Sequence, residues 1–217
     1  RTGIDLLPSF REKREVIDIT DLIDAARRTV AMAEIAPGRY NRHAGGKSDG
    51  AGDNPYGCAD AANILYTIEA FPRDAETRRA FVDALSGIQH ADGLWREDTH
   101  HPIHTTAHCI AALELFDASP ALPLVALAEL RDPRRMEAFL DALPWREDPW
   151  RASHQGAGLH TALTLSGEAT RAWRDAYIAW LARNADPETG FWRQGAMGPV
   201  EHAGTHTLFP HLAGSFH

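Results

Sequence analysis

A repeated order of short motifs constrains the fold of this chain more than any other feature. In three successive stretches, a Gly or Asp turn is followed by a Trp-Arg pair, a His-containing loop and a His-Thr pair that opens an apolar segment. The His-Thr pairs start at His104, His160 and His206, so they lie 56 and then 46 residues apart. A recurring unit of this length predicts stacked supersecondary units, because one helical hairpin cannot bury its own apolar face.

The segments around these motifs have helical spacing and alternate in character. In one set, apolar residues surround most of the helix circumference, which predicts buried helices, and in the other they form a stripe, which predicts a solvent face. No segment shows the alternation typical of a strand. The predicted buried helices are 56–71, 103–116 and 159–165, the amphipathic ones are 74–88, 132–143 and 168–182, and helical spacing also covers 20–33.

Buried helices that alternate with amphipathic ones predict an all-α chain, specifically an α/α toroid with inner and outer helices. A mean repeat of 51 residues gives roughly four hairpins in 217 residues. A closed ring usually has more, so we expect a partial ring or one that continues past residue 217. We treat 1–217 as a single domain, with an N-terminal helix and Gly-rich loop over 1–55 and helical-hairpin repeats over 56–217.

Charge and composition exclude several partners. The chain has 22 Lys and Arg against 30 Asp and Glu, a net charge of −8, whereas nucleic acids and anionic membranes need a basic surface. No apolar run approaches the roughly 20 residues of a membrane-spanning helix, and no signal peptide is evident. Cys58 and Cys109 do not form a disulfide framework, so we expect a cytoplasmic protein whose oligomeric state stays open.

Residues 87–95, Gly-Ile-Gln-His-Ala-Asp-Gly-Leu-Trp, followed by Thr105-Thr106-Ala107, resemble the repeats of the terpenoid cyclase and protein prenyltransferase superfamily. The resemblance implies an α/α toroid, an architecture that also hosts polysaccharide lyases, glycosidases and sugar epimerases. The chain lacks the Asp-x-Asp-Asp and Asp-Asp-x-x-Asp motifs of terpenoid enzymes. Cys58-Ala59-Asp60 reverses the Asp-x-Cys order of the prenyltransferase zinc ligands.

The His-Thr pairs are the first candidate site. In a toroid, the loops that lead into the inner helices gather at one end, so His104, His160 and His206 are expected to converge as catalytic residues. Helix N-termini favour anionic groups, and a neutral imidazole is a suitable base for a proton next to a carboxylate. The alternative is that each Thr caps a helix and each His fills the junction.

A second candidate set lies at the start of the first buried helix. Asp60 and Asn63 are three residues apart on an apolar helix, and Tyr56 lies one turn earlier. Because an unpaired buried carboxylate is costly, Asp60 is expected to face a cavity or a firm partner. We predict Tyr56 and Asp60 as catalytic and Asn63 as substrate-binding. Together with His104 and His160, Tyr56 and Asn63 match by type the Tyr–His–Asn sets of toroidal polysaccharide lyases. The alternative is a pair of satisfied core polar groups.

The Trp-Arg pairs predict a rim that binds an acidic sugar. Trp would stack on the sugar ring, and Arg would pair with its carboxylate. The alternative is that the arginines pair with neighbouring acidic residues at the surface. The predicted substrate-binding residues are Trp95, Arg96, Trp150, Arg151, Trp192 and Arg193.

A metal site is not favoured, and no cofactor is predicted. The alternative is zinc held by His104 and His108, which are four residues apart and share a helical face. Taken together, these features predict an enzyme that acts on a carbohydrate or acidic small molecule by His/Tyr/Asp acid–base chemistry, as a lyase, epimerase or hydrolase. The alternatives are a terpenoid-cyclase-like or prenyltransferase-like enzyme, and a non-catalytic helical-repeat scaffold that binds a protein or peptide.

Overall fold

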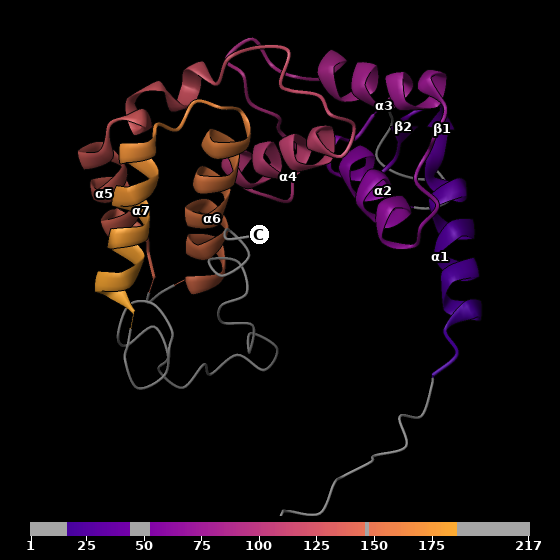
Figure 1. The fold of residues 1–217 in the computed structure, drawn as a ribbon, viewed down its shortest axis with the longest axis horizontal. Helices are drawn as coiled ribbons and strands as arrows, with labels where there is room; N and C mark the ends of the chain where they lie inside the picture. Colours follow the sequence, from indigo (N-terminus) through magenta and orange to yellow (C-terminus); the bar gives the residue numbers. More distant parts are fainter. Residues whose placement is uncertain (1–16, 44–52, 146–147, 186–217) are drawn as a thin grey trace, which may run out of the picture.

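The computed structural model describes residues 17–43, 53–145 and 148–185. In this part of the chain the fold is mostly helical, as predicted, with seven α-helices, one 3-10 helix and a two-stranded hairpin (Figure 1). The helices are α1 (Thr20–Ala33), α2 (Pro55–Thr67), α3 (Ala75–Gly87), α4 (Pro102–Glu114), the 3-10 helix η1 (Val125–Arg131), α5 (Pro133–Ala142), α6 (Pro149–Leu165) and α7 (Arg171–Asn184).

Three helices form an inner row. The most extensive packing joins α4 to α6, followed by that of α2 on α4, so α4 lies between α2 and α6 (Figure 1). Around this row, α3 packs on α2 and α4, α5 packs on η1 and α7, and α7 also contacts α6. Consecutive helices therefore pack on each other in the pairs α2–α3 and α6–α7, whereas α5 has its main contacts with η1 and α7.

Each inner helix begins with a capping side chain followed by proline. A side chain at this position accepts a hydrogen bond from a free backbone N–H of the first turn, and proline suits the first helical position because that N–H is not needed there. Asn54 precedes Pro55 and accepts from the N–H of Gly57 at 2.9 Å. His101 precedes Pro102 and accepts from the N–H of Ile103 at 3.2 Å. Asp148 precedes Pro149 and accepts from the N–H of Arg151 at 3.1 Å.

This cap corrects the prediction for the third inner helix. The helix was expected to begin at residue 159, but Asp148 and Pro149 start α6 ten residues earlier. His104 lies in the first turn of α4, as its motif predicts, whereas His160 lies deep inside α6. The two His-Thr pairs are therefore not structurally equivalent.

The register of the Trp repeat also differs from the prediction. In the first repeat, Asp92 and Gly93 form the turn, and the buried Trp95 donates its indole N–H to the carbonyl of Leu85 in α3 at 2.8 Å. The equivalent in the next repeat is Trp145, which is buried and donates to the carbonyl of Leu140 in α5 at 2.7 Å. Trp150, which the motif had aligned with Trp95, lies instead at the start of α6.

A short hairpin lies where a helix end and a loop were predicted. Strands β1 (Glu34–Ala36) and β2 (Arg39–Tyr40) are antiparallel and follow α1 directly. Gly38 forms the turn with a φ of +73°, and a Cβ there would lie 2.4 Å from the carbonyl carbon of Ala80 in α3. Only glycine fits this approach, which fixes the hairpin against α3.

The two cysteines are free, and both are buried. Among the described residues, no helix combines the length and the apolar character that crossing a membrane requires.

Candidate functional site

Seven side chains gather near the starts of the inner helices. Tyr56 and Asp60 come from α2, His104 and His108 from α4, and His154 from α6, while Glu97 and His100 come from the loop before α4. We call this set the Tyr56 cluster. It unites three of the predicted catalytic residues, namely Tyr56, Asp60 and His104.

Tyr56 is the centre of the cluster. Its hydroxyl is hydrogen-bonded to Nε2 of His104 at 3.0 Å. Its ring stacks on His100 and on His108, with ring centroids 4.3 Å apart in each case. Burial, and after it the negative charge of Asp60, raises the pKa of Tyr56 to about 12. The phenol therefore keeps its proton at neutral pH and can donate it.

A second hydrogen-bonded pair lies one helical turn further along. Nε2 of His108 lies 2.8 Å from Oδ1 of Asp60. The side chain of Asp60 is 45% exposed and that of His108 is 23% exposed, so this side of the cluster is open to solvent. Asp60 thus has the firm partner that was predicted.

The close approach of α6 to α4 brings in His154. The rings of His104 and His154 stack almost in parallel, with centroids 4.1 Å apart and an interplanar angle of 8°. Gly158 permits this contact, because a Cβ there would lie 3.1 Å from the Cα of His104. Trp150 lies one turn before His154, and the two rings meet in an edge-to-face arrangement with their centroids 4.6 Å apart.

Glu97 fixes the remaining histidine. Its carboxylate accepts hydrogen bonds from the backbone N–H and the hydroxyl of Thr99, and it lies 2.8 Å from Nδ1 of His100. Burial alone would raise the pKa of Glu97, but the hydrogen bonds from Thr99 and His100 outweigh it, so the pKa is lowered. The side chain of Glu97 is only 4% exposed, so its negative charge lies in an almost buried position.

Two other predicted residues lie elsewhere. His160 faces α7 and lies on a different face of α6 from His154. Its ring centroid is 4.5 Å from that of Tyr177 and 6.0 Å from that of Trp173. Its pKa is lowered by burial and, secondarily, by Arg174. Asn63 donates its amide to the carbonyl of Ala59 at 2.9 Å within α2.

The predicted Trp-Arg rim does not form one surface in the described residues. Trp95 has no exposed area, so no sugar ring can stack on it. Arg96 pairs with Asp92, and Arg151 lies 3.6 Å from Asp148, in line with the alternative of surface ion pairs. His206, Trp192 and Arg193 lie outside the described residues.

Sequence reasoning missed His154, His100 and Glu97 as members of the cluster. The signal for His154 was present in the pair Asp148-Pro149, which marks a helix start and places His154 in its second turn. His100 and Glu97 lie in a loop, where no periodicity indicates which way a side chain points.

Metal binding has no support in the described part of the chain. There, no group of three or more His, Cys, Asp or Glu side chains could hold a metal ion. The two histidines of the zinc alternative direct Nε2 to other partners, His104 to the Tyr56 hydroxyl and His108 to Asp60.

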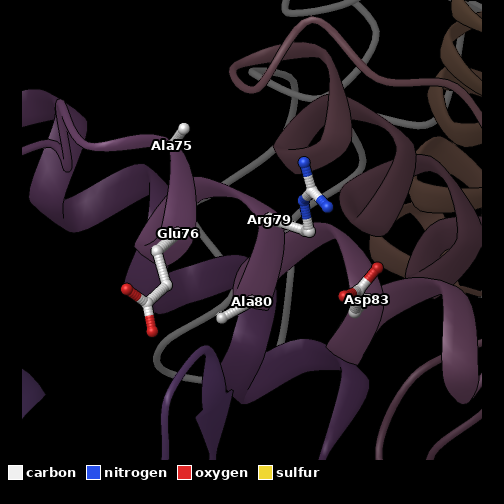
Figure 2. A pocket seen from close by; sticks show the side chains of 5 residues that line it. All are labelled: Ala75, Glu76, Arg79, Ala80 and Asp83. Carbon is white, nitrogen blue, oxygen red and sulfur yellow. The ribbon is translucent and has the colours of Figure 1, made fainter.

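Two concavities open elsewhere on the surface. One, of about 450 Å³, is lined by residues of α3, and Figure 2 shows Glu76 and Arg79 pointing in different directions, so their charges do not converge. The other, of about 840 Å³, lies beside the end of α2 and includes Tyr66, Phe71 and Arg78. Neither is lined by a member of the Tyr56 cluster.

In comparisons with protein-family models, with curated proteins and with solved structures, nothing matches this chain. The resemblance to terpenoid cyclase repeats therefore stays a prediction from the sequence.

Proposed function

We propose that the chain is an acid–base enzyme that acts on a carbohydrate or acidic small molecule, with the Tyr56 cluster as its active site. The observation that carries the proposal is the hydrogen bond of 3.0 Å between the Tyr56 hydroxyl and Nε2 of His104. In this proposal, the inner row α2–α4–α6 and the outer helices are part of an α/α toroid, and substrate binds at the N-terminal ends of the inner helices.

The Tyr56–His104 pair can pass a proton in either direction. When Tyr56 gives its proton to a substrate oxygen or carbon, a protonated His104 can return one to the phenolate through the same hydrogen bond. When a substrate C–H proton is removed, the phenolate accepts it after its own proton has moved to His104. Such transfers by positioned side chains typically contribute about 10²- to 10⁴-fold to a rate.

The other charged pairs support this chemistry. Asp60 is hydrogen-bonded to His108, and the rings of both His100 and His108 stack on Tyr56. Burial favours the resting phenol, so Tyr56 holds its proton until a substrate is bound. Lyases, epimerases and hydrolases all need a donor and an acceptor of this kind, and the substrate decides among them.

The test is proton exchange and turnover on a panel of uronic acids, hydroxy acids and oligosaccharides in deuterated water. Tyr56→Phe removes only the hydroxyl, and His104→Gln removes the proton acceptor. We expect each to lower the rate at least about 100-fold. The matched controls are Tyr66→Phe, whose residue is 58% exposed on the same helix, and His90→Gln, whose residue is exposed at a turn outside the cluster.

Both controls should keep the rate of the native chain. Full activity in Tyr56→Phe or His104→Gln would refute the proposed site, and so would equal losses in the controls. Turnover of isoprenoid diphosphates in place of the panel would favour the terpenoid-cyclase-like alternative. Absence of turnover on every compound would favour the scaffold alternative.

A further inference from the structure

Arg42 lies beside the Tyr56 cluster and has no role in the proton transfers described above. It follows β2 and Asn41, whose backbone N–H donates to the carbonyl of Ala33 at 2.9 Å. The chain then passes directly against α2, since a Cβ on Gly57 would lie 2.5 Å from the carbonyl oxygen of Asn41 and 3.0 Å from the backbone nitrogen of Arg42. Arg42 is therefore held at the first turn of α2.

The guanidinium of Arg42 stands over the ring of Tyr56, with its Cζ 4.4 Å from the ring centroid. Its Nη1 is buried and has no hydrogen-bond partner among the described residues. A buried N–H of a charged group that lacks an acceptor is costly, and such a group in a native fold calls for an explanation.

The nearby carboxylates do not supply that acceptor. Asp60 is hydrogen-bonded to His108, and Glu97 to Thr99 and His100. Asp53, close to Arg42 in sequence, pairs with Arg39 at 2.6 Å. The positively charged guanidinium of Arg42 thus lies beside the Tyr56–His104 pair, and its Nη1 can still donate a hydrogen bond.

We infer that Arg42 binds a carboxylate of the substrate, which narrows the substrate class to carboxylic acids, with sugar acids such as uronates as the members that also fit the carbohydrate prediction. The inference rests on the proposed function, because it places the carboxylate beside Tyr56 and His104. A carboxylate fits better than a phosphate dianion, because one guanidinium provides a planar fork while Asp60 and Glu97 add negative charge nearby.

Binding the carboxylate would also assist the reaction. The Tyr56–His104 pair takes the proton from the carbon next to the carboxylate, and the C–H electron pair becomes the C=C bond of an enolate whose oxygens Arg42 neutralises. The enolate then takes a proton back at that carbon, which completes an epimerisation. Alternatively, it expels the oxygen at the neighbouring carbon, which leaves with the proton and completes an elimination.

The test is isothermal titration of the full 217-residue chain with D-glucuronate, D-galacturonate, D-glucose and glucose 6-phosphate. We expect the uronates to bind at least about 10-fold more tightly than glucose, as a charge-assisted hydrogen bond allows. Arg42→Gln should abolish this preference, and Arg42→Lys, which keeps the charge and loses the fork, should reduce it several-fold. The matched control, Arg79→Gln on the exposed face of α3, should leave it unchanged.

Uronates that bind no better than glucose would overturn the inference, and so would an unchanged preference in Arg42→Gln. Tighter binding of glucose 6-phosphate would overturn the choice of a carboxylate. Circular dichroism checks that each variant is folded, and if Arg42→Gln is not, Arg42→Lys decides by the same criterion.

The outcomes separate this inference from the proposed function. Tyr56→Phe and His104→Gln should still bind uronates, because neither residue supplies the carboxylate contact. If turnover depends on Tyr56 and His104 but KM is unchanged in Arg42→Gln, only the inference fails. If uronate binding depends on Arg42 but turnover does not depend on Tyr56 or His104, only the proposed function fails.

Discussion

Gly57→Ala tests the close packing that positions both Tyr56 and Arg42. The added Cβ would lie 2.5 Å from the carbonyl oxygen and 2.7 Å from the carbonyl carbon of Asn41. Both are backbone atoms, and the segment that holds them is fixed by the hydrogen bonds from Asn41 to Ala33 and from Asn54 to the carbonyl of Tyr40. The clash cannot be relieved by rotating a side chain, so α2 or the segment after β2 must move.

The magnitude follows from two opposing terms. Overpacking a well-packed site costs about 1–3 kcal/mol, and Ala in place of Gly returns at most about 1 kcal/mol of helix propensity, less in a first turn. We expect Gly57→Ala to lower the free energy of unfolding by about 2 kcal/mol. For a chain of this size that lowers the unfolding midpoint by about 4–8 °C.

Gly87→Ala is the matched control. Gly87 ends α3, and a Cβ there would meet nothing within 4 Å. Its only effect is the gain in helix propensity, up to about 1 kcal/mol, so the midpoint should stay or rise slightly. Thermal unfolding followed by circular dichroism measures both variants. A midpoint for Gly57→Ala equal to or above that of the native chain would refute the packing argument.

Three further predictions address single groups. Burial, and after it Arg174, lowers the pKa of His160, so the folded chain favours the neutral imidazole. The contribution of His160 to the free energy of unfolding should therefore be complete above the unfolded pKa of about 6.5 and should fall as the pH drops below it. In urea unfolding, His160→Gln should reduce this fall. An unchanged pH profile would contradict the burial of that imidazole. Trp95→Phe removes the hydrogen bond to Leu85 and part of a fully buried ring, so we expect the free energy of unfolding to fall by about 2–3 kcal/mol. A fall of less than about 0.5 kcal/mol would count against that contact. In an ultraviolet titration, the ionisation step with a pKa of about 12 should be missing in Tyr56→Phe, and a missing step at the ordinary value of about 10 would argue against burial of the phenol.

The helices were predictable where burial produces periodicity. The segments 56–71, 74–88, 103–116, 132–143 and 168–182 each overlap most of a helix of the described structure, because their apolar residues face a core at helical intervals. The first half of α6 was missed because His154 and Gly158 pack on His104 of α4 instead of forming part of an apolar stripe. There the cap and proline were the better signals.

The site was only partly predictable, since spacing places residues on a helix but does not say which helices meet. Tyr56 and Asp60 were grouped by their interval on one helix, and the structure adds His104 to them. His160 shared the motif of His104 but faces α7, because the motif occurs at a different position in its helix. The contacts of Arg42 depend on the chain path after the β-hairpin, which no local pattern indicates.

The position of the Tyr56 cluster follows from how the inner helices begin. Asn54, His101 and Asp148 start these helices with free N–H groups that polar caps satisfy, so polar residues are tolerated in the first turns. Further along, the same helices bury small and apolar residues such as Ala62 and Leu113. Because α4 contacts both α2 and α6, the tolerated polar positions become neighbours and can hydrogen-bond across helices. A chain built this way can change the side chains of its candidate site without disturbing the core that holds the helices together.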